Sequence, residues 1–370
     1  MRPAKNPKSN TQHPGKHQPS ILTIPASDSK FGAWCFPGAW LLILGISVLS
    51  GCSRTKPPAP AASTPIIWPA PPEPARIAFV QSVLRPADLG LKFSPFTRFG
   101  HWLTGSDKGN EPLLKPFGLA LDENDNLCVT DTAANAVCYY DQTKKKWQRW
   151  QKIGRVQFAS PVAVAKRNGS FYVADSTLGR VIVFGEDARL QFQLTNHLSR
   201  PSGLVILHDQ LFVADSQRHA IAVFDLRGTF LREFGRRGTG QGEFNFPTHL
   251  AASADRLYVT DSMNSRVQIF EPDGAFKGEL GQAGDRPGQF GRPKGLAVDM
   301  AGRVYAVDAL FDNLQIFNPG GQLLLGLGET GSQPGEFWLP NGIAINRQNE
   351  IFVADSYNHR IQVFKYVGPT

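Results

Sequence analysis

Three short hydrophobic runs separated by polar turns recur along most of this 370-residue chain. In residues 339–364 the runs are GIAI, IFVAD and RIQVF, and the polar segments NRQN and SYNH separate them. Runs this short, rich in β-branched and aromatic residues, are typical of antiparallel strands joined by tight turns rather than of a helix. The unit occurs six times, and an aspartate closes its second predicted strand at Asp131, Asp175, Asp215, Asp261, Asp308 and Asp355.

The length of this repeat predicts the architecture. Its opening proline stands at Pro116, Pro161, Pro201, Pro247, Pro293 and Pro340, so the period is 40 to 47 residues. Four strands fit this length, and a fourth run follows turns such as Asp273-Gly274, whose residues suit hairpins. A four-stranded sheet cannot bury both faces by itself, whereas sheets repeated around a ring bury one another. The sequence therefore predicts an all-β fold, a six-bladed β-propeller with four-stranded blades.

The last repeat lacks a fourth strand, because only KYVGPT follows Phe364. Residues 76–84 (RIAFVQSVL) look like a strand and belong to no repeat. We predict that this N-terminal strand is the outer strand of the last blade. Such a pairing would close the ring and remove an open sheet edge.

The amino-acid sequence of the repeating unit resembles the NHL repeat over about residues 112–364. The shared elements are Pro-x-Gly-(Leu/Ile)-Ala, then Val-x-Asp-Ser, then Asn-x-Arg-(Val/Ile)-Gln-(Ile/Val)-Phe, and repeats four to six match them best. The first repeat keeps Asp131 but has Ala136 where the arginine stands in other copies. The resemblance implies a six-bladed NHL-type propeller.

The region before the propeller divides into a leader and a tether. Residues 1–51 begin with a basic, polar stretch and continue with AWLLILGISVL, which is shorter than the roughly 20 residues of a bilayer span. Leu49-Ser50-Gly51-Cys52 resembles the lipobox of bacterial lipoproteins, which implies a signal peptide and lipidation (palmitate) at Cys52. An ordinary signal peptide or a short anchor helix is the alternative. Residues 52–75 are a Pro/Ala-rich tether, and residues 76–370 are the propeller.

These features predict a location in the bacterial cell envelope. The protein would be anchored by lipid on a periplasmic or extracellular face, with the outer membrane favoured because Ser53 follows the lipidated cysteine. Residues 1–74 hold seven Lys/Arg and two Asp/Glu, so most of the net charge of +8 lies outside the propeller. The sequence therefore predicts no nucleic-acid partner.

Two cysteines, Cys128 and Cys138, belong to the propeller and flank the first predicted hairpin. A hairpin centred near Ala133 would place them opposite each other, and an oxidising compartment permits a disulfide bond. The alternative is a pair of small buried hydrophobic residues. The sequence leaves both interpretations open.

The polar features that recur in every blade are interpreted as structural. The six aspartates would each bond the backbone of a neighbouring turn, sometimes with the arginine five residues on. The glycine-rich segments 235–244, 281–290 and 328–337 would be connectors between strands.

Positions that vary within the repeat are better candidates for a site. The residue after each opening proline should face the channel mouth, and this set is Phe117, Val162, Ser202, Thr248, Lys294 and Asn341. Blades four to six carry basic and polar residues near this mouth, whereas blades one and two carry apolar ones. Such a mouth would suit an amphipathic or anionic ligand.

Two functions follow from this interpretation. The first is a membrane-tethered binding or scaffold propeller that recognises a protein, peptide or glycan partner at one mouth, without a cofactor. The alternative is a metal-dependent lyase or lactonase-like enzyme with calcium or zinc in the channel. NHL-like propellers include a zinc-dependent amidating lyase with a metal histidine after the motif proline, and none of the six positions here is histidine. Three histidines, His219, His249 and His359, would have to converge instead.

Overall fold

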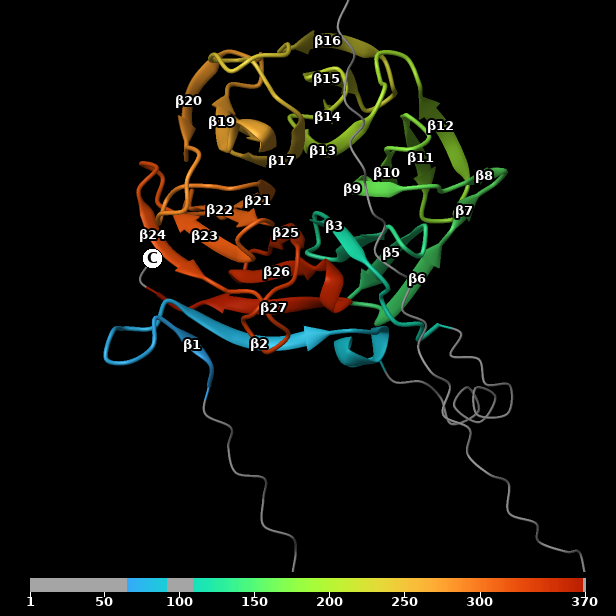
Figure 1. The fold of residues 1–370 in the computed structure, drawn as a ribbon. Coiled ribbons are helices and arrows are strands. Elements are labelled where there is room, and N and C mark those ends of the chain that lie inside the picture. The colour runs from blue at the N-terminus through green and yellow to red at the C-terminus, as the bar shows by residue number, and fades with distance from the viewer. Residues whose placement is uncertain (1–64, 92–108, 369–370) are drawn as a thin grey trace, which may run out of the picture. The chain divides into compact units, whose positions relative to one another are not determined.

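The computed structural model describes residues 65–91 and 109–368. In these residues six antiparallel sheets stand around a common centre (Figure 1). Each complete blade contains four strands that follow one another in sequence. The first strands of neighbouring blades lie against each other, so they form the inner wall of the ring. The predicted six-bladed, four-stranded propeller is confirmed.

The strands of the first three blades are as follows. Blade one contains β3 (Pro116–Leu121), β4 (Leu127–Asp131), β5 (Ala136–Asp141) and β6 (Lys146–Trp150). A small hairpin of β7 (Lys152–Ile153) and β8 (Val156–Gln157) follows it. Blade two contains β9 (Pro161–Arg167), β10 (Ser170–Asp175), β11 (Arg180–Gly185) and β12 (Leu190–Leu194). Blade three contains β13 (Pro201–Leu207), β14 (Gln210–Asp215), β15 (Ala220–Asp225) and β16 (Phe230–Phe234).

The remaining blades follow the same order. Blade four contains β17 (Pro247–Ser253), β18 (Arg256–Asp261), β19 (Arg266–Phe270) and β20 (Phe276–Leu280). Blade five contains β21 (Pro293–Val298), β22 (Val304–Asp308), β23 (Asn313–Phe317) and β24 (Leu323–Leu327). Blade six contains β25 (Pro340–Ile345), β26 (Glu350–Asp355) and β27 (Arg360–Tyr366). Short 3₁₀ turns occur at η1 (Pro86–Leu89), η2 (Ser262–Asn264) and η3 (Ser356–Asn358).

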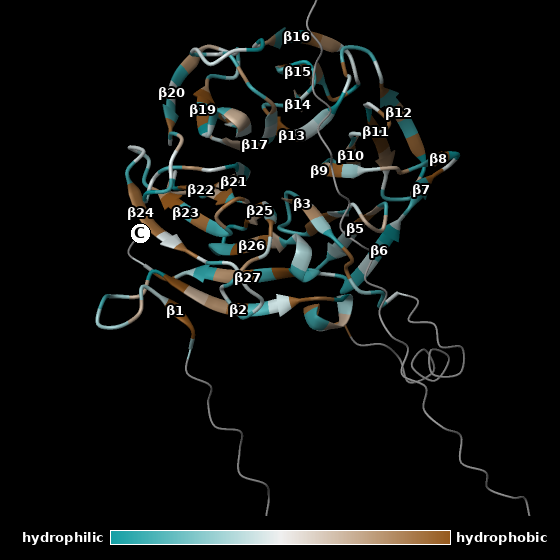
Figure 2. Ribbon diagram, viewed as in Figure 1, coloured by the Kyte–Doolittle hydropathy of each residue, from teal (hydrophilic) through white to brown (hydrophobic). Residues whose placement is uncertain are grey.

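The hydrophobic core consists of six clusters, each between two neighbouring blades. The cluster between blades two and three, for example, joins Val183 and Leu194 to Val213 and Phe224. Hydrophobic residues are concentrated in the strands (Figure 2). In the outer strand β12, burial increases along the strand, from exposed Leu190 to buried Leu194. Because both faces of a blade are covered, the second and third strands are buried almost throughout.

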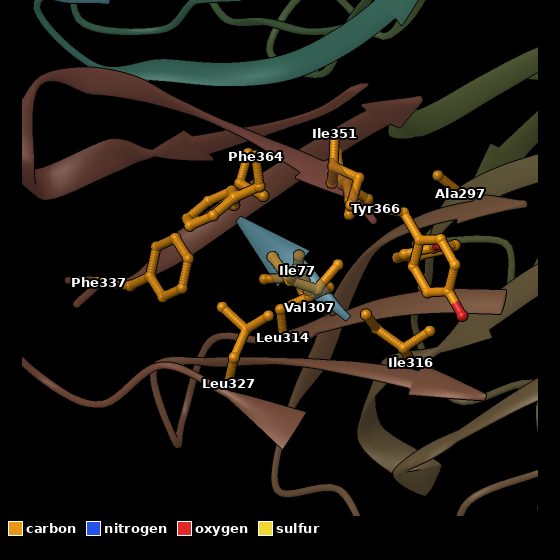
Figure 3. Packing of buried hydrophobic residues seen from close by; sticks show 13 residues of the cluster. Ile77, Ala297, Val307, Leu314, Ile316, Leu327, Phe337, Ile351, Phe364 and Tyr366 are labelled. Carbon is orange, nitrogen blue, oxygen red and sulfur yellow. The ribbon is translucent and has the colours of Figure 1, made fainter. Parts of the chain in front are cut away.

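An N-terminal strand completes blade six. β2 (Ile77–Val83) pairs antiparallel with β27, and β1 (Ile67–Trp68) pairs with β2 at the edge. Ile77 lies in the core between blades five and six, beside Leu314 and Phe364 (Figure 3). Trp68 packs edge-on against Phe364 with ring centroids 5.8 Å apart. Ile67 and Trp68 therefore belong to the folded domain, although the sequence placed them in the tether of residues 52–75. They are part of it because β1 pairs with β2 and Trp68 packs against the core.

Several sequence-based predictions fall outside the described residues. They are the leader of residues 1–51, lipidation at Cys52 and the first part of the tether. In the part of the chain that the structure describes, no helix is long and apolar enough to cross a membrane.

The two propeller cysteines do not form the disulfide bond that was considered. Both thiols are free and buried. In the hairpin of β4 and β5, Cys128 pairs with Tyr139 and Cys138 pairs with Val129, one position away from each other. Since side chains alternate between the faces of a sheet, the two thiols point into different cores. Burial raises the pKa of the Cys138 thiol to about 12, so it stays protonated at neutral pH.

We expect Ile77→Ala to destabilise the protein by about 2–5 kcal/mol, because it leaves a cavity in the core between blades five and six, where the N-terminal strand packs. Val80→Ala in the same strand is the control, since Val80 is 46% exposed. Urea denaturation followed by circular dichroism measures both. Equal midpoints for the two variants would contradict a structural role for this strand.

Candidate functional site

A cavity of about 740 Å³ opens at the end of the ring where the first strand of each blade begins. Five of the six residues predicted at the mouth line it, and they are Phe117, Val162, Ser202, Thr248 and Lys294. Asn341 does not line this cavity, although its Oδ1 atom is buried without a hydrogen-bond partner. We call this cavity the cup. The sequence therefore located the cup through the residues that follow the motif prolines.

The conserved geometry of each blade presents these side chains. The blade aspartate accepts hydrogen bonds from the backbone just before the motif proline, as when Asp308 accepts from Arg292 N at 3.0 Å. In three blades the serine after the aspartate donates to the proline carbonyl of the next blade, as in Ser176 to Pro201 at 2.6 Å. These bonds fix the backbone on both sides of the proline. The aspartates therefore serve the backbone, as the sequence suggested.

The residue before the proline also lines the cup, which the sequence analysis missed. In four blades the aspartate accepts from the backbone N–H of this residue, whereas in blade four Phe246 N donates to His219 Nδ1, and these side chains all lie at the same end of the ring. The lining contains five such residues, and they are Lys115, Ser160, Arg200, Phe246 and Arg292. The sequence contained a signal for these residues, because the residue type at this position differs from one blade to the next.

Positive charge dominates the cup. Lys115, Arg200, Arg292 and Lys294 line it, and no aspartate or glutamate does. The sequence predicted that the basic residues near the mouth come from blades four to six. These four cations instead come from blades one, three and five. Arg360, a basic residue of blade six, does not line the cup, because it is buried and bonds Asp355 Oδ2 at 2.8 Å.

Lys294 is the least compensated of these cations. It lies at the inner wall on β21, and its ammonium makes no hydrogen bond or ion pair with any described residue. Burial, together with the nearby charges of Arg292 and Arg200, lowers the pKa of Lys294 to about 8. Lys294 is only partly exposed, and a partly desolvated amine without a counter-ion is destabilising unless a ligand supplies the negative charge.

His249 closes the centre of the cup. It comes from β17 in blade four and stacks on Phe117 from β3 in blade one, with ring centroids 6.1 Å apart. These two blades stand on opposite sides of a six-membered ring, so the stacked pair spans the channel. Burial lowers the pKa of His249 to about 3, with a further contribution from Lys294, and the imidazole is therefore neutral.

His249 replaces a glycine of the repeat. At the corresponding Gly203, an added Cβ would lie only 2.3 Å from the Thr248 carbonyl oxygen of the next blade. The ring packs most tightly at this position, so a large side chain there must turn into the channel. The sequence showed the substitution but not the burial that results from it.

Several buried polar atoms around this floor have no hydrogen-bond partner in the described structure. They are both ring nitrogens of His249, Thr248 Oγ1 and Asn341 Oδ1. Unsatisfied buried polar atoms are uncommon in folded proteins and costly where they occur. Three of these four atoms, the two ring nitrogens of His249 and Thr248 Oγ1, belong to residues that line the cup.

The three histidines do not converge on a metal site. His219 Nδ1 accepts from Phe246 N at 3.2 Å, and His359 Nδ1 contacts the Leu114 carbonyl in a different blade. Within residues 65–91 and 109–368, no group of three His, Cys, Asp or Glu side chains could hold a metal ion. The donors present therefore do not fit the calcium or zinc site of the alternative function.

A second buried lysine shows what a structural cation looks like in this fold. Lys166 bonds Asp122 at 2.9 Å and Glu186 at 2.8 Å, and its side chain is 4% exposed. Burial alone would lower the pKa of Lys166, but these two carboxylates raise it well above its usual value. Lys294 has no such partners.

We expect opposite stability effects from the two matched substitutions. Lys166→Met should destabilise the protein by about 3–5 kcal/mol, because Asp122 loses its counter-ion. Lys294→Met should stabilise it by about 1–3 kcal/mol, because an unpaired, partly buried charge disappears. Urea denaturation measures both.

The gain from Lys294→Met should depend on pH. The folded state holds this proton more weakly than the unfolded state, so wild type is penalised fully below pH 8. The penalty fades as the pH rises to the ordinary lysine value of 10.5. A loss of stability in Lys294→Met at pH 6 would contradict this description of the site.

Comparison with known proteins identifies the repeat. The NHL repeat pattern matches residues 337–364. A family described as "6-bladed beta-propeller" matches residues 189–252 and 247–310. No curated protein matches the chain in sequence.

Solved structures share the fold at low sequence identity. Virginiamycin B lyase from Staphylococcus aureus has a TM-score of 0.51 at 12% identity, covering 69% of this chain and 96% of the lyase. A gluconolactonase from Xanthomonas campestris has a TM-score of 0.53 at 15% identity, covering 68% and 86%. A luciferin-regenerating enzyme has a TM-score of 0.50 at 13% identity, covering 69% and 92%. With the blade count and the matched repeats, the chain is an NHL-repeat six-bladed β-propeller protein.

Proposed function

We propose that this propeller is a binding protein that holds an anionic group of its partner in the cup. The observation that carries this proposal is Lys294, a partly buried ammonium without a counter-ion among the described residues, in a cavity lined by three further cations and no carboxylate. A carboxylate, phosphate or sulfate would supply the missing charge. The partner would be a protein, a peptide or a glycan that carries such a group.

Charge and hydrogen bonding would cooperate in this cup. The ligand's negative group would interact with Lys294, and the exposed Arg200 and Arg292 would attract it from solution. Neutral His249 can donate one hydrogen bond and accept another, and Thr248 Oγ1 can do the same. The stacked Phe117 ring adds an apolar surface beside these groups.

We further propose that the protein acts in the bacterial cell envelope, tethered through Cys52. The support is the sequence around Cys52, which lies outside the described residues. A tethered disc would present its cup to partners in the periplasm or at the cell surface.

An enzymatic function is the second candidate. It is favoured by two titratable groups in one cavity whose pKa values are both displaced, since such pairs are common at catalytic sites. A lyase or lactonase reaction at this site would rely on Lys294 and His249. A metal-dependent form has weaker support, because the described donors do not form a metal site.

The binding proposal is tested with dansylglycine, a small amphipathic carboxylate whose fluorescence reports binding. We expect wild type to bind it and Lys294→Met to bind at least tenfold more weakly, because the ion pair at the cup is lost. Lys277→Met is the matched control, since Lys277 lies on the outer strand β20 and pairs with Glu271 at 2.6 Å.

Neutral dansylglycine amide distinguishes charge recognition from apolar adsorption. It should bind wild type at least tenfold more weakly than the acid does. Equal affinities of wild type and Lys294→Met for the acid would refute the proposal. A turnover of ester or lactone substrates that disappears in Lys294→Met would favour the enzymatic alternative.

A further inference from the structure

An arc of exposed apolar side chains borders the cup on one side only. These residues stand before the motif prolines or in the turns after the blade aspartates, at the mouth of the ring. They are Leu114, Phe246, Met263, Leu310, Trp338, Leu339 and Tyr357, and each is between 38% and 59% exposed. We call this set the apolar arc. It runs through blades four, five, six and one.

The rest of the rim is polar. In blades two and three the equivalent positions hold Ser160, Thr177, Arg200 and Gln217, and in the described residues no large apolar side chain is exposed there. The other exposed apolar residues lie apart from the mouth, as with Leu190 and Leu231 on outer strands. Exposed apolar side chains gathered beside a polar cavity are typical of an interaction surface.

The arc is an ordered surface that continues into the cup. Trp338 packs on Tyr357 with ring centroids 5.6 Å apart, and Lys115 lies 4.3 Å over the Tyr357 ring. Phe246 and Met263 belong to both the arc and the cup lining. A ligand that contacts the arc at Phe246 and Met263 therefore also contacts the cup.

The geometry favours a ligand that ends in the cup. The stacked pair of Phe117 and His249 spans the channel at its centre, and the far rim offers no apolar surface. A peptide chain that enters over the arc cannot pass through the ring, because the stacked pair spans the channel. It also cannot continue across the mouth on apolar contacts, because the far rim is polar. Its end would lie beside Lys294, where negative charge is needed.

We propose that the apolar arc and the cup together bind the carboxyl-terminal segment of a partner protein, with apolar side chains on the arc and the terminal carboxylate in the cup. This inference rests on the proposed function and names its ligand. Aromatic side chains of the arc would supply contact area at low entropic cost, and the unpaired groups of His249 and Thr248 would bond the last peptide unit.

An anionic membrane surface is the competing occupant, and the rim argues against it. A planar membrane would contact all six blades at once, whereas the apolar arc covers only blades four, five, six and one. The cations moreover lie in a concave cup and do not form a flat surface.

The test uses the full-length protein and a pool of amino-terminally labelled hexapeptides in which each of the last four positions is Leu, Phe, Val or Ala. Peptides retained by the immobilised protein are measured again singly by fluorescence anisotropy. We expect amidation of the carboxyl terminus to weaken binding at least tenfold. Trp338→Ser and Leu310→Ser should each weaken it about three- to tenfold.

Met300→Ser is the matched control, because Met300 is 81% exposed and lies in the turn before β22, at the other end of the strands. Trp338→Ser should leave dansylglycine affinity unchanged, so a failure of the arc is separable from a failure of the cup. Three results would overturn the inference. They are no retained peptide, equal binding of acid and amide, or binding to phosphatidylglycerol vesicles that Trp338→Ser abolishes while no peptide binds.

Discussion

The burial of each blade against its neighbours is the constraint on which this structure depends. A four-stranded sheet with two apolar faces is stable only when both are covered, and six interfaces cover all of them. The N-terminal strand completes the last blade by pairing with β27, and its Ile77 enters the core between blades five and six that contains Leu314 and Phe364. Because the ring then has no free apolar face, the inner strands are held in place and the residues at their ends have defined positions.

A second set of interactions makes these positions usable. The buried carboxylate of each blade fixes the loop before the first strand of the same blade, as Asp308 does at Arg292. Serine hydroxyls connect neighbouring blades at the same level, as Ser262 does with the Pro293 carbonyl at 2.8 Å. These repeated groups satisfy one another. The unsatisfied groups, such as Lys294 and His249, stand at the centre where the repeat varies. The contrast between satisfied repeats and unsatisfied centre is why the cup is the candidate site.

The sequence predicted the fold because the repeat specifies it at every level, from strand length to turn residues. It also placed Phe117 and Lys294 at the mouth, since the period of the repeat fixes which end of a strand they occupy. It could not settle the relation of Cys128 to Cys138, because a shift of one residue in a hairpin moves a side chain to the other face. That register follows from the turn geometry, which the residue pattern left ambiguous.

Other features of the site depend on contacts between distant blades. Phe117 and His249 are 132 positions apart in the sequence, and only closure of the ring brings their rings together. The apolar arc likewise combines residues from four blades whose exposure no local pattern reveals. The structural role of Arg360 and the unpaired state of Lys294 are distinguished by one fact, the presence of a carboxylate within reach.

The account is tested most directly by measuring the pKa of the Lys294 amine. Reductive ¹³C-methylation of the lysines followed by NMR gives each amine a signal, and Lys294→Met identifies the relevant one. The account predicts that Lys294 titrates with a midpoint at about pH 8 in the free protein, and with a higher midpoint when dansylglycine is bound. A midpoint at the ordinary lysine value of 10.5 that does not respond to the anion would contradict it.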